Sequence, residues 1–122
     1  FTETAPGLAG EIRTEAGDYP QSIGDIVLAR KDFGTSYHLS VVLDDAAQGI
    51  THVTRGADLF EATRIHVLLQ DLLALPRPVY HHHPLIRDAQ GRRLAKRDDA
   101  RALSKYRADG AGPQDIRRML GL

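Results

Sequence analysis

The chain has 122 residues, which is enough for one domain or for part of one. Its hydrophobic content of 42% supports a packed core, and the absence of cysteine excludes disulfides and thiolate zinc sites within these residues. No apolar run approaches the roughly 18 residues that span a bilayer, and no secretory signal pattern opens the chain, so a cytoplasmic protein is expected.

The formal net charge is zero, but the charges are distributed unevenly along the chain. Residues 1–86 contain 6 Lys and Arg against 11 Asp and Glu, whereas residues 87–122 contain 10 against 5. The cationic part includes the run GRRLAKRD (91–98), in which a glycine precedes the basic residues. Such asymmetry can draw phosphate groups to one side of a protein, although a solvated helical face has the same pattern.

The first half of the chain contains few strong signals. Residues 1–22 are rich in Gly, Thr, Glu and Pro without a period, and we expect a loop or an edge that forms no regular element. The run DIVLARK (25–31) has a β-branched, apolar centre and predicts a strand, and DFGTS (32–36) predicts a turn. Residues 37–49 fit either a buried strand or a helix that ends at Gly49.

Strands and helices alternate in the next part of the chain. Alternating apolar and polar residues at 50–56 predict a strand, and residues 58–75 predict a helix that ends at Pro76. The expected apolar face of this helix consists of Ile65, Leu68, Leu69, Leu72 and Leu75. Residues 78–86 then predict a strand, and residues 87–93 predict a turn or hairpin.

Two short helices complete the predicted succession. One begins at Asp98 or Asp99 and ends before Gly110, and the other begins at Pro113 and ends before Gly121. Strands that alternate with helices in this way predict an α/β fold.

Arg55 is the first candidate for a ligand-binding residue. Ligands of α/β sheets bind beyond the carboxyl ends of the strands, and Arg55 and Gly56 end the strand predicted at 50–56. This position makes Arg55 more than an ordinary surface arginine.

The triple histidine at 81–83 and the aspartate pair at 44–45 are weaker candidates for a functional site. In a strand, successive side chains point to opposite faces, so at most His81 and His83 of the triple histidine could share a metal, and no cysteine is available to help. A structural or nucleotide-packing role is favoured, and no metal site is expected. Asp44 and Asp45 also point apart, which favours a surface or structural role over an acid–base pair.

The basic run is a candidate for binding phosphate. A lysine on a glycine-hinged loop suits a polyphosphate whose charge rises in a transition state, but by spacing alone the signal is weak and a solvated loop is favoured. The sequence contains neither a P-loop nor a dinucleotide fingerprint.

Three segments together resemble one known family. SYHLSVVLDDAAQGITHVTRGADLFEAT, LPRPVYHHHPLI and GRRLAKRD occur in the order and at the separations found in the catalytic domain of glutamyl-tRNA synthetases. The resemblance covers about residues 24–122. The segment QGITHVTRGADL makes the resemblance closer to the glutamyl-Q tRNA(Asp) synthetase type.

The resemblance implies a fold and an activity. The fold is the second half of a class I Rossmann-like parallel sheet (24–90), preceded by an edge or loop (1–23) and followed by a KMSKS-type loop (91–97) and C-terminal helices (98–122). The activity is that of an ATP-dependent ligase that uses Mg²⁺ and activates L-glutamate as an adenylate. The glutamyl-Q type then transfers glutamate to the queuosine base of tRNA(Asp). The cysteine cluster that binds zinc in some relatives has no counterpart in these residues.

The resemblance also implies roles for residues of the two substrate pockets. Tyr37 and Arg55 match residues that bind glutamate, and Arg55 would pair with its side-chain carboxylate, which a planar guanidinium can hold bidentately. Asp58 matches an acidic residue near the ATP ribose. Leu85 and Ile86 match positions whose backbone and apolar contacts hold the adenine.

In the KMSKS-type loop, Lys96 matches the lysine that contacts the ATP phosphates and stabilises the charge that develops on them. We therefore expect Lys96 to be catalytic. Arg93 replaces the first lysine of the motif and keeps its charge, whereas Ala95 replaces the serine and loses a hydroxyl. Leu94 and Arg97 complete the loop.

The HIGH-type motif of the first half of the sheet has no match in these residues. The chain, which does not begin with Met, is therefore expected to be the C-terminal part of a catalytic region and to be inactive alone. Two alternatives remain, a part of an ordinary glutamyl-tRNA synthetase and a non-catalytic module that binds nucleotide or RNA through its basic end. A helical anticodon-binding domain downstream would favour the first alternative, and the lack of a HIGH-type motif upstream would favour the second.

Overall fold

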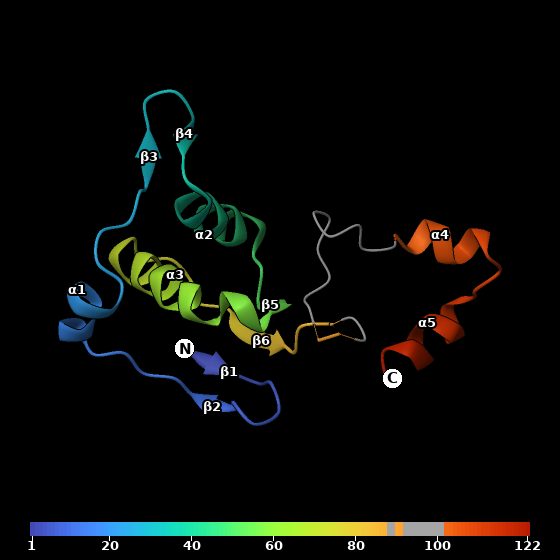
Figure 1. Cartoon of the computed structure of the whole chain (residues 1–122). Helices are drawn as coiled ribbons and strands as arrows, with labels where there is room; N and C mark the ends of the chain where they lie inside the picture. Colours follow the sequence, from blue (N-terminus) through green and yellow to red (C-terminus); the bar gives the residue numbers. More distant parts are fainter. Residues whose placement is uncertain (88–89, 92–101) are drawn as a thin grey trace. The chain divides into compact units, whose positions relative to one another are not determined.

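The computed structural model describes residues 1–87, 90–91 and 102–122. These residues form two compact units, Phe1–Pro84 and Leu85–Leu122. The first unit contains a sheet with helices packed against it, and the second contains two short helices (Figure 1). The division into residues 1–23, 24–90, 91–97 and 98–122, which the resemblance implied, stays a prediction.

A mixed sheet lies at the centre of the first unit. Its strands, in spatial order, are β2 (Gly10–Glu11), β1 (Thr2–Glu3), β6 (Val79–His83) and β5 (His52–Gly56). β5 and β1 are both parallel to β6, and β2 is antiparallel to β1. This arrangement confirms the α/β fold class and the two strands predicted at 50–56 and 78–86. The register places Arg55 of β5 beside His82 of β6.

The first residues of the chain contribute to this sheet, so the expectation that residues 1–22 form no regular element was wrong. β1 lies between β2 and β6, with Glu3 beside Tyr80, and two short helical segments follow, η1 (Ala16–Asp18) and α1 (Tyr19–Ser22). A strand of two residues is too short for an alternating pattern to be visible in the sequence.

The long helix predicted after β5 is present as η2 (Ala57–Leu59) and α3 (Phe60–Leu72), and it connects the parallel strands β5 and β6. After the helix, Ala74 has a φ of 52° and the N–H of Leu75 donates to the Gln70 carbonyl at 2.8 Å. Pro76 follows, and its ring is incompatible with a continuing helix.

The buried face of α3 is more polar than predicted. Its buried residues are Thr63, His66, Val67, Leu69 and Gln70. Of the predicted apolar face, Leu69 is buried and Ile65 and Leu68 are half-buried, but Leu72 is 74% exposed. The buried face includes polar residues because these side chains find hydrogen-bond partners on β5 and β6.

Residues 37–49, which fit either a strand or a helix, form helix α2 (Tyr37–Gln48). α2 packs beside α3 (Figure 1). Gly49 ends the helix with a φ of 66°, and its N–H donates to the Ala46 carbonyl at 3.2 Å. This left-handed conformation at the end of a helix favours glycine.

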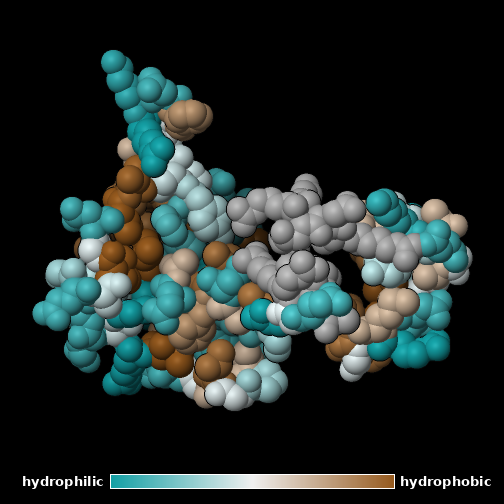
Figure 2. Space-filling view, viewed as in Figure 1, coloured by the Kyte–Doolittle hydropathy of each residue, from teal (hydrophilic) through white to brown (hydrophobic). Residues whose placement is uncertain are grey.

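The strand predicted at 25–31 was largely wrong. Only β3 (Ala29–Arg30) is a strand there, and it pairs with β4 (Gly34–Thr35) in an exposed hairpin that projects beyond α2 (Figure 1). Figure 2 shows hydrophobic surface along the segment that leads from α1 to β3, where Val27 and Leu28 are exposed. The apolar residues of this run therefore do not enter the central sheet.

The apolar core of the first unit is small. Phe1, Val67 and Tyr80 form a buried cluster, and the Phe1 ring meets the Tyr80 ring edge to face, with 5.4 Å between their centroids. Polar residues occupy a comparable share of the interior, and these are Glu3, Thr63, His66, Gln70 and His82. Because buried polar groups are costly unless they are hydrogen-bonded, their partners decide how this unit is held together.

The second unit contains α4 (Leu103–Ala108) and α5 (Pro113–Met119). α5 has the predicted limits, and α4 ends before Gly110 as predicted, whereas its predicted start at Asp98 or Asp99 lies outside the described residues. No helix in the described ranges is long and apolar enough to cross a membrane.

We expect Gly49→Ala to destabilise the full-length protein by about 1 kcal/mol, because alanine disfavours the left-handed conformation. No atom of a non-neighbouring residue lies within 4 Å of the new Cβ position, so the cost is backbone strain alone. Gly17→Ala is the matched control, since its surroundings are equally open and its φ lies outside the left-handed region. Denaturant unfolding of both variants checks this, and equal midpoints would contradict it.

Candidate functional site

Arg55 extends from β5 toward α3 and the neighbouring strand β6. Its Nε donates to Nε2 of His82 at 3.2 Å, its Nη1 donates to Nδ1 of His66 at 3.0 Å, and its Nη2 donates to the Thr63 hydroxyl. The Tyr80 ring lies beneath the guanidinium, 5.2 Å from its Cζ. Three nitrogens of one side chain are therefore held by side chains of two different elements.

The histidines around Arg55 act as acceptors, because a guanidinium can only donate hydrogen bonds. Nδ1 of His66 therefore carries no proton, and its Nε2–H donates to Nδ1 of His38 at 3.0 Å. Burial, the Arg55 charge and His38 together lower the pKa of His66 to about 4. His66 is thus neutral at pH 7, in the tautomer that accepts from Arg55.

His82 is held on its other side by Glu3 of β1. Nδ1 of His82 donates to Oε2 of Glu3, whose Oε1 accepts the backbone N–H groups of Thr4, Ala5 and His82 at 2.9, 2.8 and 3.1 Å. Burial raises the pKa of Glu3, but the hydrogen bonds from His82 and Ala5 outweigh it and hold this pKa below its ordinary value. The proton on Nδ1 leaves Nε2 of His82 free to accept from Arg55.

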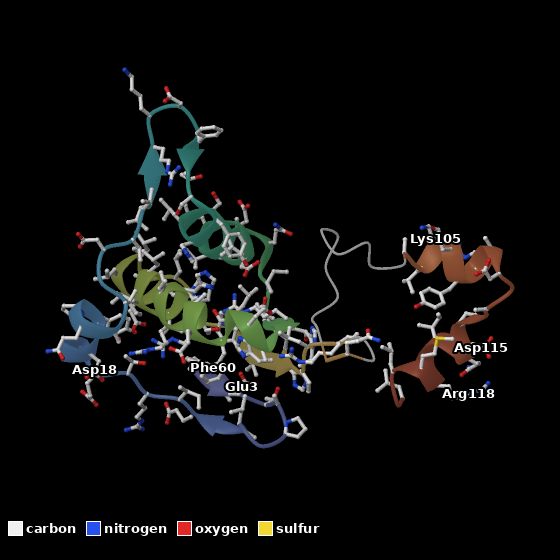
Figure 3. The ribbon with its side chains drawn as sticks, in the orientation of Figure 1. Glu3, Asp18, Phe60, Lys105, Asp115 and Arg118 are labelled. Carbon is white, nitrogen blue, oxygen red and sulfur yellow. The ribbon has the colours of Figure 1, made fainter. Side chains whose placement is uncertain are left out.

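Figure 3 labels Glu3 on β1 and Phe60 at the start of α3, the two elements that enclose His82. The Phe60 ring lies edge to face with the His82 ring, with 5.1 Å between centroids. The carboxylate and the aromatic ring therefore restrict the orientation of His82 from two sides.

The guanidinium of Arg55 has no ion-pair partner among the described residues. Its hydrogen-bond acceptors are uncharged. The Arg55 charge also acts on the Asp45 carboxyl, but burial of Asp45 outweighs this effect and raises the pKa of Asp45. A half-buried cation surrounded by neutral acceptors gains free energy from an anionic ligand, because the attraction is stronger there than in water.

Tyr37 lies next to this network. It is the first residue of α2, and its ring centroid is 5.7 Å from that of His66 and 5.8 Å from that of His38. Since His66 accepts from Arg55, the structure brings together the two residues that the sequence predicted to bind glutamate.

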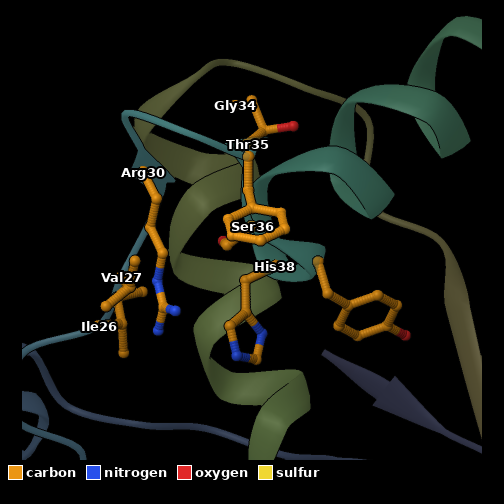
Figure 4. A pocket seen from close by; sticks show the side chains of 9 residues that line it. Ile26, Val27, Arg30, Gly34, Thr35, Ser36 and His38 are labelled. Carbon is orange, nitrogen blue, oxygen red and sulfur yellow. The ribbon is translucent and has the colours of Figure 1, made fainter.

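A pocket of about 500 Å³ opens between the β3–β4 hairpin and the start of α2. Figure 4 shows Arg30 of β3 and His38 of α2 along its walls. The pocket also reaches Tyr37 and Ser36, and within the described part of the chain the Ser36 hydroxyl is buried without a partner. It is therefore adjacent to the His38 end of the chain of hydrogen bonds that leads to Arg55.

The other predicted site residues belong to other elements or lie outside the described residues. Asp58 belongs to η2 and is exposed. Leu85 and Ile86 belong to the second unit, where Leu85 is half-buried and Ile86 is exposed. The predicted loop residues, including the expected catalytic lysine, lie outside the described residues, and they are Arg93, Leu94, Ala95, Lys96 and Arg97.

The triple histidine alternates between the two faces of β6, as the strand period requires. His82 is 2% exposed, whereas His81 is half-buried and lies 3.0 Å from the Thr4 hydroxyl, and His83 is exposed. Within the described ranges no three His, Cys, Asp or Glu residues are grouped so that they could hold a metal ion.

Sequence reasoning did not identify Thr63, His66, His82 and Glu3 as part of the site. A signal existed for α3, since Thr63, His66 and Gln70 are three and four residues apart and so share one helical face. No local signal existed for Glu3, which lies 79 residues from His82 in the chain.

Comparison with known proteins identifies relatives along the whole chain. A family model described as the catalytic domain of class I tRNA synthetases (E and Q) matches residues 4–122. The glutamyl-Q tRNA(Asp) synthetase of Rhodobacter capsulatus is 70% identical over 124 residues, which cover 100% of this chain and 44% of that protein. The glutamyl-Q tRNA(Asp) synthetase of Xanthomonas axonopodis pv. citri is 52% identical over 86 residues, covering 70% of this chain and 29% of that protein.

Solved structures agree with these matches. A glutamate tRNA ligase from Elizabethkingia meningosepticum, crystallised in complex with its amino acid, superposes with a TM-score of 0.57 and 34% identity. The match covers 64% of this chain and 16% of that chain. The chain thus spans less than half the length of the curated relatives named above and a smaller part of this structure.

We expect His66 to remain neutral from pH 7 down to about pH 4. Because its pKa is lower in the folded protein than the ordinary 6.5, the unfolded state binds more protons between these values. The stability that neutral His66 contributes is complete above about pH 6.5 and is lost as the pH falls toward 4, by roughly 3 kcal/mol in total.

An NMR titration of the imidazole signals of the full-length protein measures this pKa, with His66→Phe used to assign the signal. The free energy of unfolding of His66→Phe should also fall less steeply between pH 6.5 and 4 than that of the parent protein. A His66 signal with a midpoint near 6.5 would contradict the expectation.

Proposed function

This chain belongs to the family of class I tRNA synthetases (E and Q), which are ligases, and on that premise we propose that the full-length protein activates L-glutamate with ATP. The observation that carries the proposal is the Arg55 guanidinium, which is held by neutral acceptors and has no carboxylate partner among the described residues. The side-chain carboxylate of glutamate supplies the missing anion.

Arg55 and Tyr37 form one side of the proposed glutamate pocket. A planar guanidinium holds a carboxylate through two parallel hydrogen bonds, whereas the amide of glutamine offers one acceptor oxygen and no charge. The Tyr37 ring meets the His66 ring edge to face and Tyr37 is 54% exposed, which leaves it accessible to the amino acid. Because the chain spans less than half of its curated relatives, the other side of the pocket belongs to the remaining part, and these residues alone are expected to be inactive.

The ATP site is proposed from the match to the family. Lys96 of the basic loop would contact the phosphates, Asp58 the ribose, and Leu85 and Ile86 the adenine. Mg²⁺ is proposed to enter with the ATP phosphates, which are its usual partners in such enzymes. Lys96 would stabilise the charge that builds on the phosphates as pyrophosphate leaves.

For the acceptor, we propose the queuosine base of tRNA(Asp). Support comes from the relatives named glutamyl-Q tRNA(Asp) synthetase, one of which is 70% identical over the whole chain. The likeness to a glutamate tRNA ligase supports a second candidate, an ordinary glutamyl-tRNA synthetase.

Arg55→Lys in the full-length protein is expected to lower kcat/KM for glutamate by about 100-fold, because one ammonium cannot copy the bidentate grip of the guanidinium. Glutamate-dependent ATP–pyrophosphate exchange in the presence of tRNA(Asp) measures this. Arg13→Lys, at an exposed arginine outside the site, is the matched control. An unchanged kcat/KM would reject Arg55 as the glutamate-binding residue.

Transfer of radiolabelled glutamate identifies the acceptor. We expect labelling of tRNA(Asp) that contains queuosine, and no labelling of tRNA(Asp) that lacks it or of tRNA(Glu). The queuosine-free tRNA(Asp) is the matched control, since it differs from the substrate at a single base. Labelling of tRNA(Glu) would instead assign the protein to the second candidate.

A further inference from the structure

The remaining hydrogen-bond capacity of Arg55 can be counted. A guanidinium has five N–H groups, one on Nε and two on each terminal nitrogen. His82 takes the one on Nε, His66 takes one on Nη1, and Thr63 takes one on Nη2. Counting acceptors among the described residues alone, one N–H therefore remains on each terminal nitrogen, and two N–H groups on different nitrogens are what a bidentate carboxylate requires.

We propose that Thr63, His66 and His82 are positioning residues, which orient the Arg55 guanidinium and leave this pair of N–H groups for the side-chain carboxylate of the substrate. The inference rests on the proposed glutamate-activating function and extends it to residues that do not touch the substrate. Their chemistry also matters for specificity. Because all three are uncharged acceptors, they hold Arg55 without neutralising the charge that distinguishes a carboxylate from an amide.

The buried partners of these residues support an orienting role. The Thr63 hydroxyl donates to the Leu59 carbonyl at 3.1 Å, so its lone pairs are free for Arg55. The single hydroxyl proton is shared between this carbonyl and Nε2 of His82, which lies 2.9 Å from the hydroxyl oxygen, so Thr63 and His82 also contact each other beside the guanidinium. Thr63 is completely buried and His82 is 2% exposed, which excludes water as a substitute for either.

The third acceptor is fixed equally well. His66 is 1% exposed, and its second ring nitrogen donates to His38, so its tautomer and ring orientation are both determined. An arginine on an exposed strand would sample many rotamers and lose entropy on binding. Here that cost is met during folding, which strengthens binding of the substrate.

Thr63→Val and Thr63→Ser in the full-length protein provide the test. Valine keeps the shape of threonine and removes the hydroxyl, whereas serine keeps the hydroxyl. Thr63→Val is expected to raise KM for glutamate by about 10-fold with kcat changed less than about 3-fold, since a hydrogen bond to a charged group is lost in the ground and transition states alike. Thr63→Ser should retain a KM close to that of the parent protein, and the preference for glutamate over glutamine should fall only in Thr63→Val.

His66→Phe should also raise KM for glutamate about 10-fold, since it keeps a ring but removes the acceptor. His52→Phe is its matched control, because His52 is an exposed residue of β5 whose ring nitrogen lies beside Thr51. If His66→Phe does not fold, the isosteric Thr63→Val variant still decides the question.

A double-mutant cycle separates this inference from the proposed function. In an Arg55→Lys background, Thr63→Val should change KM less than about 2-fold, because there is no longer a guanidinium to orient. Equal effects of Thr63→Val in both backgrounds, or a parent-like KM for Thr63→Val alone, would overturn the positioning role while leaving glutamate binding by Arg55 intact. An Arg55→Lys protein with unchanged kinetics would overturn the proposed function, and the positioning role with it.

Discussion

The Arg55 guanidinium, fixed between three uncharged acceptors, is the interaction around which the first unit is organised. His82 holds it from the neighbouring strand, and Thr63 and His66 hold it from the helix above. These contacts link β5, β6 and α3 through polar groups. They matter because the apolar core of this unit is small. Because its acceptors carry no charge, the guanidinium keeps its positive charge without a carboxylate partner among the described residues, which suits it to an anionic ligand.

The parallel β5–α3–β6 arrangement is what makes this network possible. Adjacent parallel strands place Arg55 and His82 side by side, and the connecting helix returns across the same face of the sheet. β1 then adds Glu3, whose carboxylate sets the proton position of His82. The glutamate pocket that we propose at the carboxyl end of β5 is thus held rigid by residues of β6, α3 and β1.

Much of this could be predicted from the sequence. The strands around Arg55 and His82, the helix between them and its end near Pro76 all follow from periodicity and from proline chemistry. Three motifs in order indicated the family, which the family match confirmed. The prediction of a strand at 25–31 was largely wrong. An apolar, β-branched run favours a strand but does not show whether a neighbouring strand is present for it to pair with.

By itself, then, the sequence determined the elements from β5 to β6, the fold class and the family, since each depends on nearby residues or on the residues of a motif. Only the tertiary structure decided which face of α3 is buried, because partners on the sheet override an apolar period that would have buried Leu72. It also decided that Glu3 reaches His82 across 79 residues of chain. Hydrogen bonds between buried groups depend on positions in space, and no pattern along one segment records them.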